Sequence, residues 1–204
     1  METSEEVGSR PLDNEFPDTS RRLPGEEGVW IIIFGDMCLF ALFFGVFLYY
    51  RALDVETYRQ AQALLDERVG LLNTIVLLVS SWFVVFAVAL ARNCAFAAAR
   101  KIILAACLFG LLFVVLKGLE YAAHFGSGHT LISNEFFMFY FMYTGIHLVH
   151  VLIGLGALAY TYSRLGTDQD RQGQHTELLE SSGSFWHLVD LLWVVLFALL
   201  YLVK

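Results

Sequence analysis

A few ionisable side chains lie inside long apolar stretches of the sequence, and these are the residues that could do chemistry. His147 and His150 are three positions apart, as are His187 and Asp190, so each pair would share one face of a helix. Asp36 lies among apolar and aromatic neighbours. We group these five residues as one buried set that is either linked to protons or serves to pack neighbouring helices together.

Asp36 is the most informative of these residues because a charge inside a bilayer is costly. Desolvation would favour the neutral acid, which could exchange a proton or react with carboxyl reagents. The alternative is an acid that only hydrogen-bonds to a neighbouring helix. His187 and Asp190 start near the same side of the membrane as Asp36, so the three could form one polar cluster.

The histidines raise the question of a metal or haem, since His is the usual nitrogen ligand of both. A membrane cytochrome with two haems needs four His at matched depths, whereas only His147, His150 and His187 lie clearly within apolar segments. No Cys or Asp at metal-ligand spacing accompanies His147 and His150. We therefore assign no metal ligands and keep a single haem, between His187 and one of the other two, as a remote alternative.

Lys117 and Glu120 form a second pair, three positions apart near the outer end of the third apolar segment. Lys117 either extends to the membrane surface or pairs with Glu120. We call these two residues the outer-side pair.

The segments that carry these residues are long enough to cross a bilayer. Of 204 residues, 57% are hydrophobic and 16% are charged, against about 25% charged in soluble domains. The apolar runs are continuous rather than alternating, which excludes spanning strands. We predict an all-α, polytopic integral membrane protein whose five transmembrane helices occupy about 29–50, 69–91, 102–123, 136–162 and 185–203.

Charge distribution supports this organisation and sets an orientation. The net charge is −7 without a basic stripe, which argues against nucleic-acid binding. Residues 1–27 are acidic, hold all three prolines and are predicted to be a flexible tail before a membrane domain at 28–204. Eight Lys and Arg fall on the N-terminal side against four on the other, which predicts a cytoplasmic N-terminus and a periplasmic C-terminus.

Four stretches, in this order, resemble subunit III of the haem–copper oxidase superfamily, and the resemblance covers residues 24–204. They are Asp36 to Phe47, Leu72 to Ser81, Glu120-Tyr121 followed by Thr144-Gly145-x-His147-x-x-His150-x-x-x-Gly154, and Trp186-His187-x-x-Asp190-x-x-Trp193. The resemblance implies the short, five-helix form of a non-catalytic subunit in a bacterial inner membrane. Such a subunit binds no haem or copper, carries structural phospholipid, and supports assembly, stability or proton uptake of a catalytic haem–copper-type partner.

Two departures from the family pattern bear on the branch. Asp36 stands where oxidase subunits usually have Glu, and Lys117 stands where they usually have an uncharged polar residue. With the short length, these features look more like the accessory factors associated with nitric oxide reductase and denitrification, which we favour. The partner would then be the reductase large subunit.

Other identities stay open. The first is subunit III of a cytochrome c or quinol oxidase, bound to oxidase subunit I. A small membrane cytochrome, or a proton-coupled transporter using Asp36 and Asp190, is more remote, since five helices without inverted repeats are untypical of transporters.

Overall fold

All regular structure in the described part of the chain is helical, which confirms the predicted fold class. The computed structural model describes residues 27–126, 128, 134–165 and 172–203, so all of the predicted tail except Glu27 lies outside them. Five helices are long and apolar enough to cross a membrane, as predicted. The elements are α1 (Glu27–Leu53), α2 (Val55–Gln62), α3 (Glu67–Arg92), α4 (Phe96–Gly126), α5 (Glu135–Arg164), α6 (Gln172–Phe197) and the π-helical turn η2 (Ala198–Leu202).

The helices extend beyond the apolar runs that predicted them. The largest difference is in α6, which begins at Gln172, whereas the predicted span begins at residue 185. Hydropathy identifies only the apolar part of a helix, and the helix can continue through polar residues on either side until a capping residue or turn ends it. The segment between the first two predicted spans also contains α2, which the apolar pattern missed because most of its residues are polar. Only Tyr58, Ala61 and Gln62 are buried in it.

Short polar side chains mark several helix starts. Asp54 accepts a hydrogen bond from the Thr57 N–H at 3.2 Å and so caps α2. These contacts hold the pKa of the Asp54 carboxyl below its ordinary value. Asp66 caps α3 and Asn134 caps α5 in the same way, accepting from backbone N–H groups at 2.9 and 2.8 Å.

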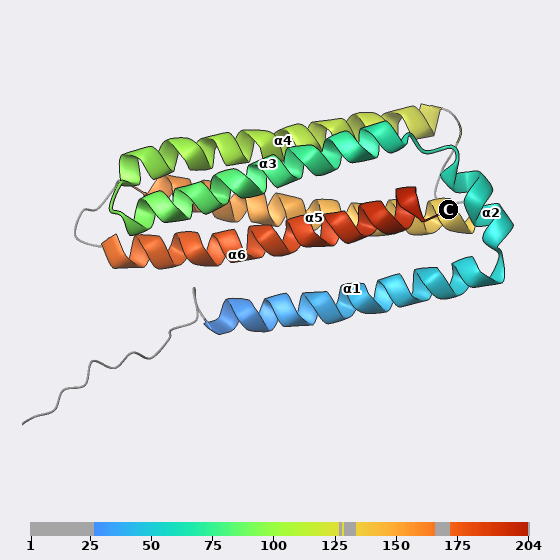
Figure 1. Cartoon of the computed structure of the whole chain (residues 1–204), viewed down its shortest axis with the longest axis horizontal. Helices are drawn as coiled ribbons and strands as arrows, with labels where there is room; N and C mark the ends of the chain where they lie inside the picture. The colour runs from blue at the N-terminus through green and yellow to red at the C-terminus, as the bar shows by residue number, and fades with distance from the viewer. Residues whose placement is uncertain (1–26, 127, 129–133, 166–171, 204) are drawn as a thin grey trace, which may run out of the picture.

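The turn between α3 and α4 is closed by a Schellman motif. The Ala95 N–H bonds the Leu90 carbonyl and the Cys94 N–H bonds the Ala91 carbonyl, each at 2.9 Å. Cys94 has a φ of 57°, in the left-handed region that usually holds glycine at this position. The tight turn makes α3 and α4 antiparallel neighbours (Figure 1).

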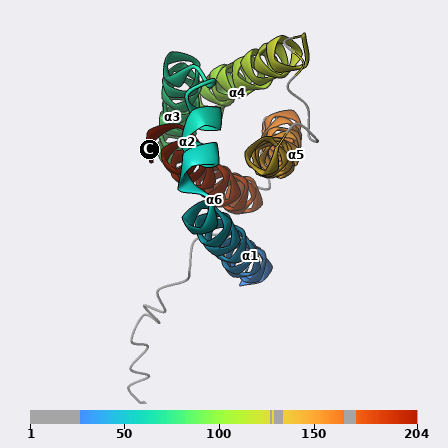
Figure 2. The same cartoon turned by 90° about the vertical axis from the view of Figure 1, so that its right-hand side faces the viewer.

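Helices α3, α4, α5 and α6 form one bundle, and α1 lies beside it. Figure 2, which looks along the helices, shows α1 on the far side of α6 from α3 and α4. The C-terminus lies at the same end of the bundle as α2 (Figure 1). We call this the α2 end and use it as the reference for depth.

Glycines let α4, α5 and α6 approach one another around the indole of Trp186. A Cβ at Gly110 would lie 2.7 Å from this ring, and a Cβ at Gly154 would lie 2.8 Å from it. Trp186 is fully buried. The indole therefore fits between α4 and α5 because Gly110 and Gly154 have no side chains.

Large aromatic side chains bridge the wider separation between α1 and α5. The rings of Phe43 and Tyr143 stack with centroids 5.5 Å apart, and the Tyr143 hydroxyl donates to the Phe43 carbonyl at 2.7 Å. Phe47 contacts the rings of Phe136 and Phe139 further along. This aromatic seam fixes how α1 is rotated and which of its faces meets α5.

Candidate functional site

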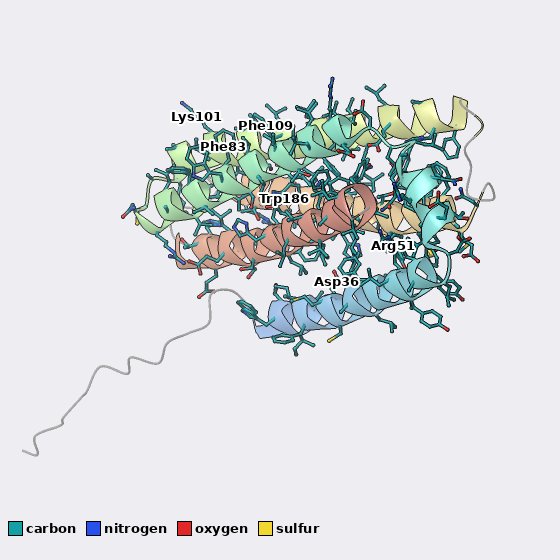
Figure 3. All side chains as sticks on the ribbon, turned by 45° about the vertical axis from the view of Figure 1, so that its right-hand side comes forward. Asp36, Arg51, Phe83, Lys101, Phe109 and Trp186 are labelled. Atoms are coloured by element: carbon teal, nitrogen blue, oxygen red, sulfur yellow. The ribbon has the colours of Figure 1, made fainter. Side chains whose placement is uncertain are left out.

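Asp36 and His150 meet across the seam between α1 and α5. The His150 Nε2 lies 3.1 Å from each carboxyl oxygen of Asp36. The two side chains are 12% and 17% exposed, so the pair is shielded without being sealed inside the bundle. Figure 3 shows Asp36 on the side of α1 that faces the other helices.

The second ring nitrogen of His150 limits how this pair can hydrogen-bond. His150 Nδ1 lies 2.8 Å from the Ile146 carbonyl oxygen, which can only accept, so Nδ1 carries a hydrogen. A neutral His150 then has a bare lone pair on Nε2, which would repel an ionised Asp36. The contact is attractive when one proton lies between them, as a carboxylic acid facing imidazole or as a carboxylate facing imidazolium. The pair is electrically neutral either way.

Lys117 and Glu120 form an ion pair inside the bundle toward the α2 end. Lys117 Nζ lies 2.9 Å from Glu120 Oε2, and the two side chains are 1% and 7% exposed. Lys117 also donates to the hydroxyls of Tyr140 and Tyr201, at 3.1 and 3.0 Å. Those hydroxyls donate to Glu120 Oε1 at 2.6 and 2.5 Å, and the Asn73 amide approaches Oε2 at 3.5 Å. Of the two predicted arrangements, the structure shows the internal pair.

The π-helical turn η2 brings Tyr201 to this ion pair. Because η2 ends at Leu202, the Leu199 and Leu200 carbonyls lack a following helical turn to bond. Gln62 of α2 donates to both of them, at 3.1 and 3.3 Å. Gly70 of α3 lets the Tyr201 ring approach, since a Cβ there would lie 2.9 Å from it. Helices α2 and α3 thus position η2, which brings Tyr201 to the cluster.

His187 and Asp190 occupy a third position, against α3. The Ser81 hydroxyl lies 2.5 Å from His187 Nδ1 and is also close to Asp190. Serine, histidine and an acid meet here, as in a hydrolase triad. In a triad the acid bonds the second ring nitrogen of the histidine, whereas Asp190 makes no such contact with His187. This group therefore connects α6 to α3 by hydrogen bonds.

His147 is separate from all of these groups. It is fully buried between the rings of Phe113 and Trp193, with centroid distances of 5.9 and 5.2 Å. Neither ring nitrogen has a hydrogen-bond partner among the residues that the structure describes.

The structure therefore divides the buried set that the sequence analysis treated as one. Asp36 lies with His150 rather than with His187 and Asp190, because α1 faces α5 here while α6 turns its polar face to α3. Depth along the helices could have identified the first pair. Asp36 and His150 both lie roughly 22–26 Å from the α2 end at about 1.5 Å per residue.

Other members of the site escaped the sequence analysis. Tyr140, Tyr201 and Asn73 read as ordinary components of apolar helices, and Ser81 as a small packing residue. Their roles come from contacts between residues 20 or more positions apart in the chain. The i,i+3 spacing of Lys117 and Glu120 was the only local signal for the cluster.

A haem between α5 and α6 would have to displace well-packed groups. His150 already uses both ring nitrogens, and His187 Nδ1 is bonded to Ser81. The indoles of Trp186 and Trp193 pack from α6 against α5 at Gly154 and His147. Within the described ranges, no three His, Cys, Asp or Glu side chains gather in a way that could hold a metal ion.

Comparison with known proteins agrees with this architecture. A family model for cytochrome c oxidase subunit III matches residues 26–204. A cytochrome c oxidase subunit 3 of Corynebacterium diphtheriae is 27% identical over 179 residues, which cover 87% of each chain. A cytochrome c oxidase subunit 3 of the tick Rhipicephalus sanguineus is 32% identical over 133 residues, 65% of this chain and 50% of the tick protein.

A heme-copper oxidase subunit I+III of Aeropyrum pernix is 24% identical over 180 residues, 86% of this chain and 22% of the archaeal protein. This chain thus spans half or less of the tick and archaeal proteins and most of the corynebacterial one. The family model covers most of the chain, including every helix that the structure describes. The chain is an integral membrane protein and belongs to the cytochrome c oxidase subunit III family.

Proposed function

We propose that this chain is a non-catalytic subunit of a respiratory haem–copper-type complex. It would bind the catalytic subunit within the membrane and support its assembly, stability or proton uptake. No haem or copper would be held by this chain, and structural phospholipid would bind to it. The similarity to cytochrome c oxidase subunit 3 supports an oxidase setting, as does the similarity to the heme-copper oxidase subunit I+III of Aeropyrum pernix.

The observation that carries this proposal is the Asp36–His150 pair. The Lys117–Glu120 pair is sealed inside the bundle and its ionic groups are saturated by hydrogen bonds. The Asp36–His150 pair instead holds one proton at a partly exposed seam. A proton at such a position is useful to a neighbouring subunit, because it can be exchanged without opening the core of this one.

For location, we propose the bacterial inner membrane with a cytoplasmic N-terminus. The Lys and Arg distribution supports this orientation. The α2 end, with the C-terminus, would then face the periplasm, and the Lys117–Glu120 pair would lie in the outer half of the bilayer.

The second candidate is an accessory factor of nitric oxide reductase. The observation that favours it is the pair of departures from the oxidase pattern, Asp36 and Lys117, both of which take part in specific contacts. Its partner would be the reductase large subunit and its setting denitrification.

Purification of the tagged full chain from its native membranes in mild detergent tests these proposals. We expect a haem-containing large subunit to co-purify, and its identity by mass spectrometry distinguishes an oxidase from a nitric oxide reductase. The chain expressed alone should show no haem absorbance. Stoichiometric haem in the isolated chain, or native membranes that yield no catalytic partner, would refute the proposal.

A further inference from the structure

His147 presents a polar group that the interior of the bundle does not satisfy. A neutral imidazole always has one N–H donor and one nitrogen acceptor. Both nitrogens of His147 are fully buried, and the described residues provide no partner for either. Buried polar groups in folded proteins are almost always hydrogen-bonded, either to protein or to ordered water.

The neighbours of His147 explain why no protein group fills this role. His150 bonds the carbonyl four residues before it, but His147 makes no such bond to Tyr143. The indole N–H of Trp193 is engaged by the Thr74 hydroxyl at 3.0 Å. Phe113 offers only a ring.

One nearby side chain retains hydrogen-bonding capacity. Thr144 is one helical turn before His147 on α5, and both side chains are buried. Its hydroxyl donates to the Tyr140 carbonyl at 2.5 Å and so accepts from the Tyr121 hydroxyl at 2.6 Å. A hydroxyl oxygen has two acceptor lone pairs, which leaves one free. Side chains at i and i+3 have Cβ atoms about 5–6 Å apart, a separation that one water molecule bridges.

We propose that His147 and Thr144 hold a buried water molecule between α4, α5 and α6. The water accepts from the imidazole N–H and donates to Thr144 Oγ1, which gives it two protein partners, as buried waters require. It completes a row of polar groups along α5, at Tyr140, Thr144, His147 and His150. This row runs from the Lys117–Glu120 pair to the Asp36–His150 pair.

Solid-state NMR of the full chain in lipid nanodiscs, with ¹⁵N-labelled histidine rings, tests the proposal. Magnetisation transferred from water should reach the His147 ring N–H, and the signal is assigned by its loss in His147→Phe. Thr144→Val removes the second partner with little change in shape. We expect the transfer to fall by about tenfold, equivalent to about 1.4 kcal/mol of water binding.

Thr161→Val is the matched control. Thr161 lies on the same helix, and its hydroxyl likewise donates to the carbonyl four residues before it and meets one other hydroxyl, that of Ser182. The transfer to His147 should be unchanged in this variant. The proposal would be overturned if the wild-type His147 N–H showed no transfer from water and its chemical shift instead indicated contact with the face of the Phe113 ring. A transfer that Thr144→Val leaves intact would overturn it as well.

Discussion

Lys117 and Glu120 neutralise one another on a single turn of α4, with 2.9 Å between Nζ and Oε2 and almost no solvent contact. Their opposite charges cancel, so the cluster has no net charge. The surrounding tyrosine hydroxyls bond both partners, so the ionic groups are also well hydrogen-bonded. Burial of either charge alone would cost several kcal/mol. The pair is therefore best understood as a unit that holds α4, α5 and η2 in register.

Removing one partner should be far worse than removing both. We expect Lys117→Met to lower the free energy of unfolding by about 3–5 kcal/mol, because it leaves Glu120 buried without a counter-charge. Lys117→Met combined with Glu120→Gln should recover most of that loss. Reversible unfolding of the full chain in mixed micelles measures both variants.

The control for this pair is Arg92→Met, which breaks the Arg92–Glu180 ion pair between α3 and α6. These side chains are 59% and 16% exposed, so the loss should stay below about 1 kcal/mol. A double variant as unstable as Lys117→Met alone would contradict the neutral-unit interpretation.

The attachment of η2 to α2 gives a second prediction. Gln62→Leu removes the donor that bonds the Leu199 and Leu200 carbonyls, so the last turn should open more often. We expect faster hydrogen exchange at the C-terminus and a loss of about 1–2 kcal/mol in stability. Gln60→Leu is matched in residue type and helix, but Gln60 is exposed, and among the described residues its side chain bonds only Glu56. Equal exchange rates in the two variants would show that Gln62 does not hold η2.

Much of this architecture can be predicted from the sequence because bilayer physics limits the options. Long, continuous apolar runs inside a bilayer must be helices, so all five spans followed from hydropathy alone. Helical spacing made the Lys117–Glu120 pair one of the two arrangements predicted for Lys117, and the structure shows this one. Depth along a helix is also encoded in residue number, at about 1.5 Å per residue.

The rotation of each helix about its own axis, unlike depth, cannot be calculated from residue number. Whether Asp36 meets His150 or Asp190 depends on which face of α1 the aromatic seam turns toward α5. That choice comes from Phe43 and Tyr143 packing across two helices, and a single sequence shows no sign of the contact. The contact of Tyr201 with Glu120 could not be predicted for a related reason. It depends on the position of η2, which is set by contacts with Gln62 of α2 and Gly70 of α3.

The seat of Trp186 gives a third prediction. Gly154→Ala places a methyl group 2.8 Å from the rigid indole, so the helices must separate, and we expect a loss of about 1–3 kcal/mol. Gly156→Ala, two residues further along α5, meets nothing within 4 Å. It should be neutral or stabilising by up to about 1 kcal/mol, since alanine favours a helix over glycine. Thermal unfolding followed by circular dichroism separates the two, and equal shifts would disprove the steric account.

Cys94 offers a fourth prediction with the opposite sign. Its φ of 57° suits glycine, so Cys94→Gly should raise stability by about 1 kcal/mol. Cys38 is also exposed but lies inside α1, where glycine should lower stability by about 1 kcal/mol. The same unfolding measurement applies, and a Cys94→Gly variant that unfolds earlier than wild type would refute the assignment of strain to this turn.

The last prediction concerns the proton that we propose lies between Asp36 and His150. In Asp36→Asn the amide can donate to the neutral His150 Nε2, so the hydrogen bond and the fold should persist. The amide cannot exchange a proton, however. We expect unchanged unfolding but altered activity or lifetime of the partner complex during sustained turnover. Asp36→Leu removes the bond as well and should lower stability by about 1–2 kcal/mol. If the partner complex carrying Asp36→Asn matches wild type through prolonged turnover, Asp36 serves only to pack α1 against α5.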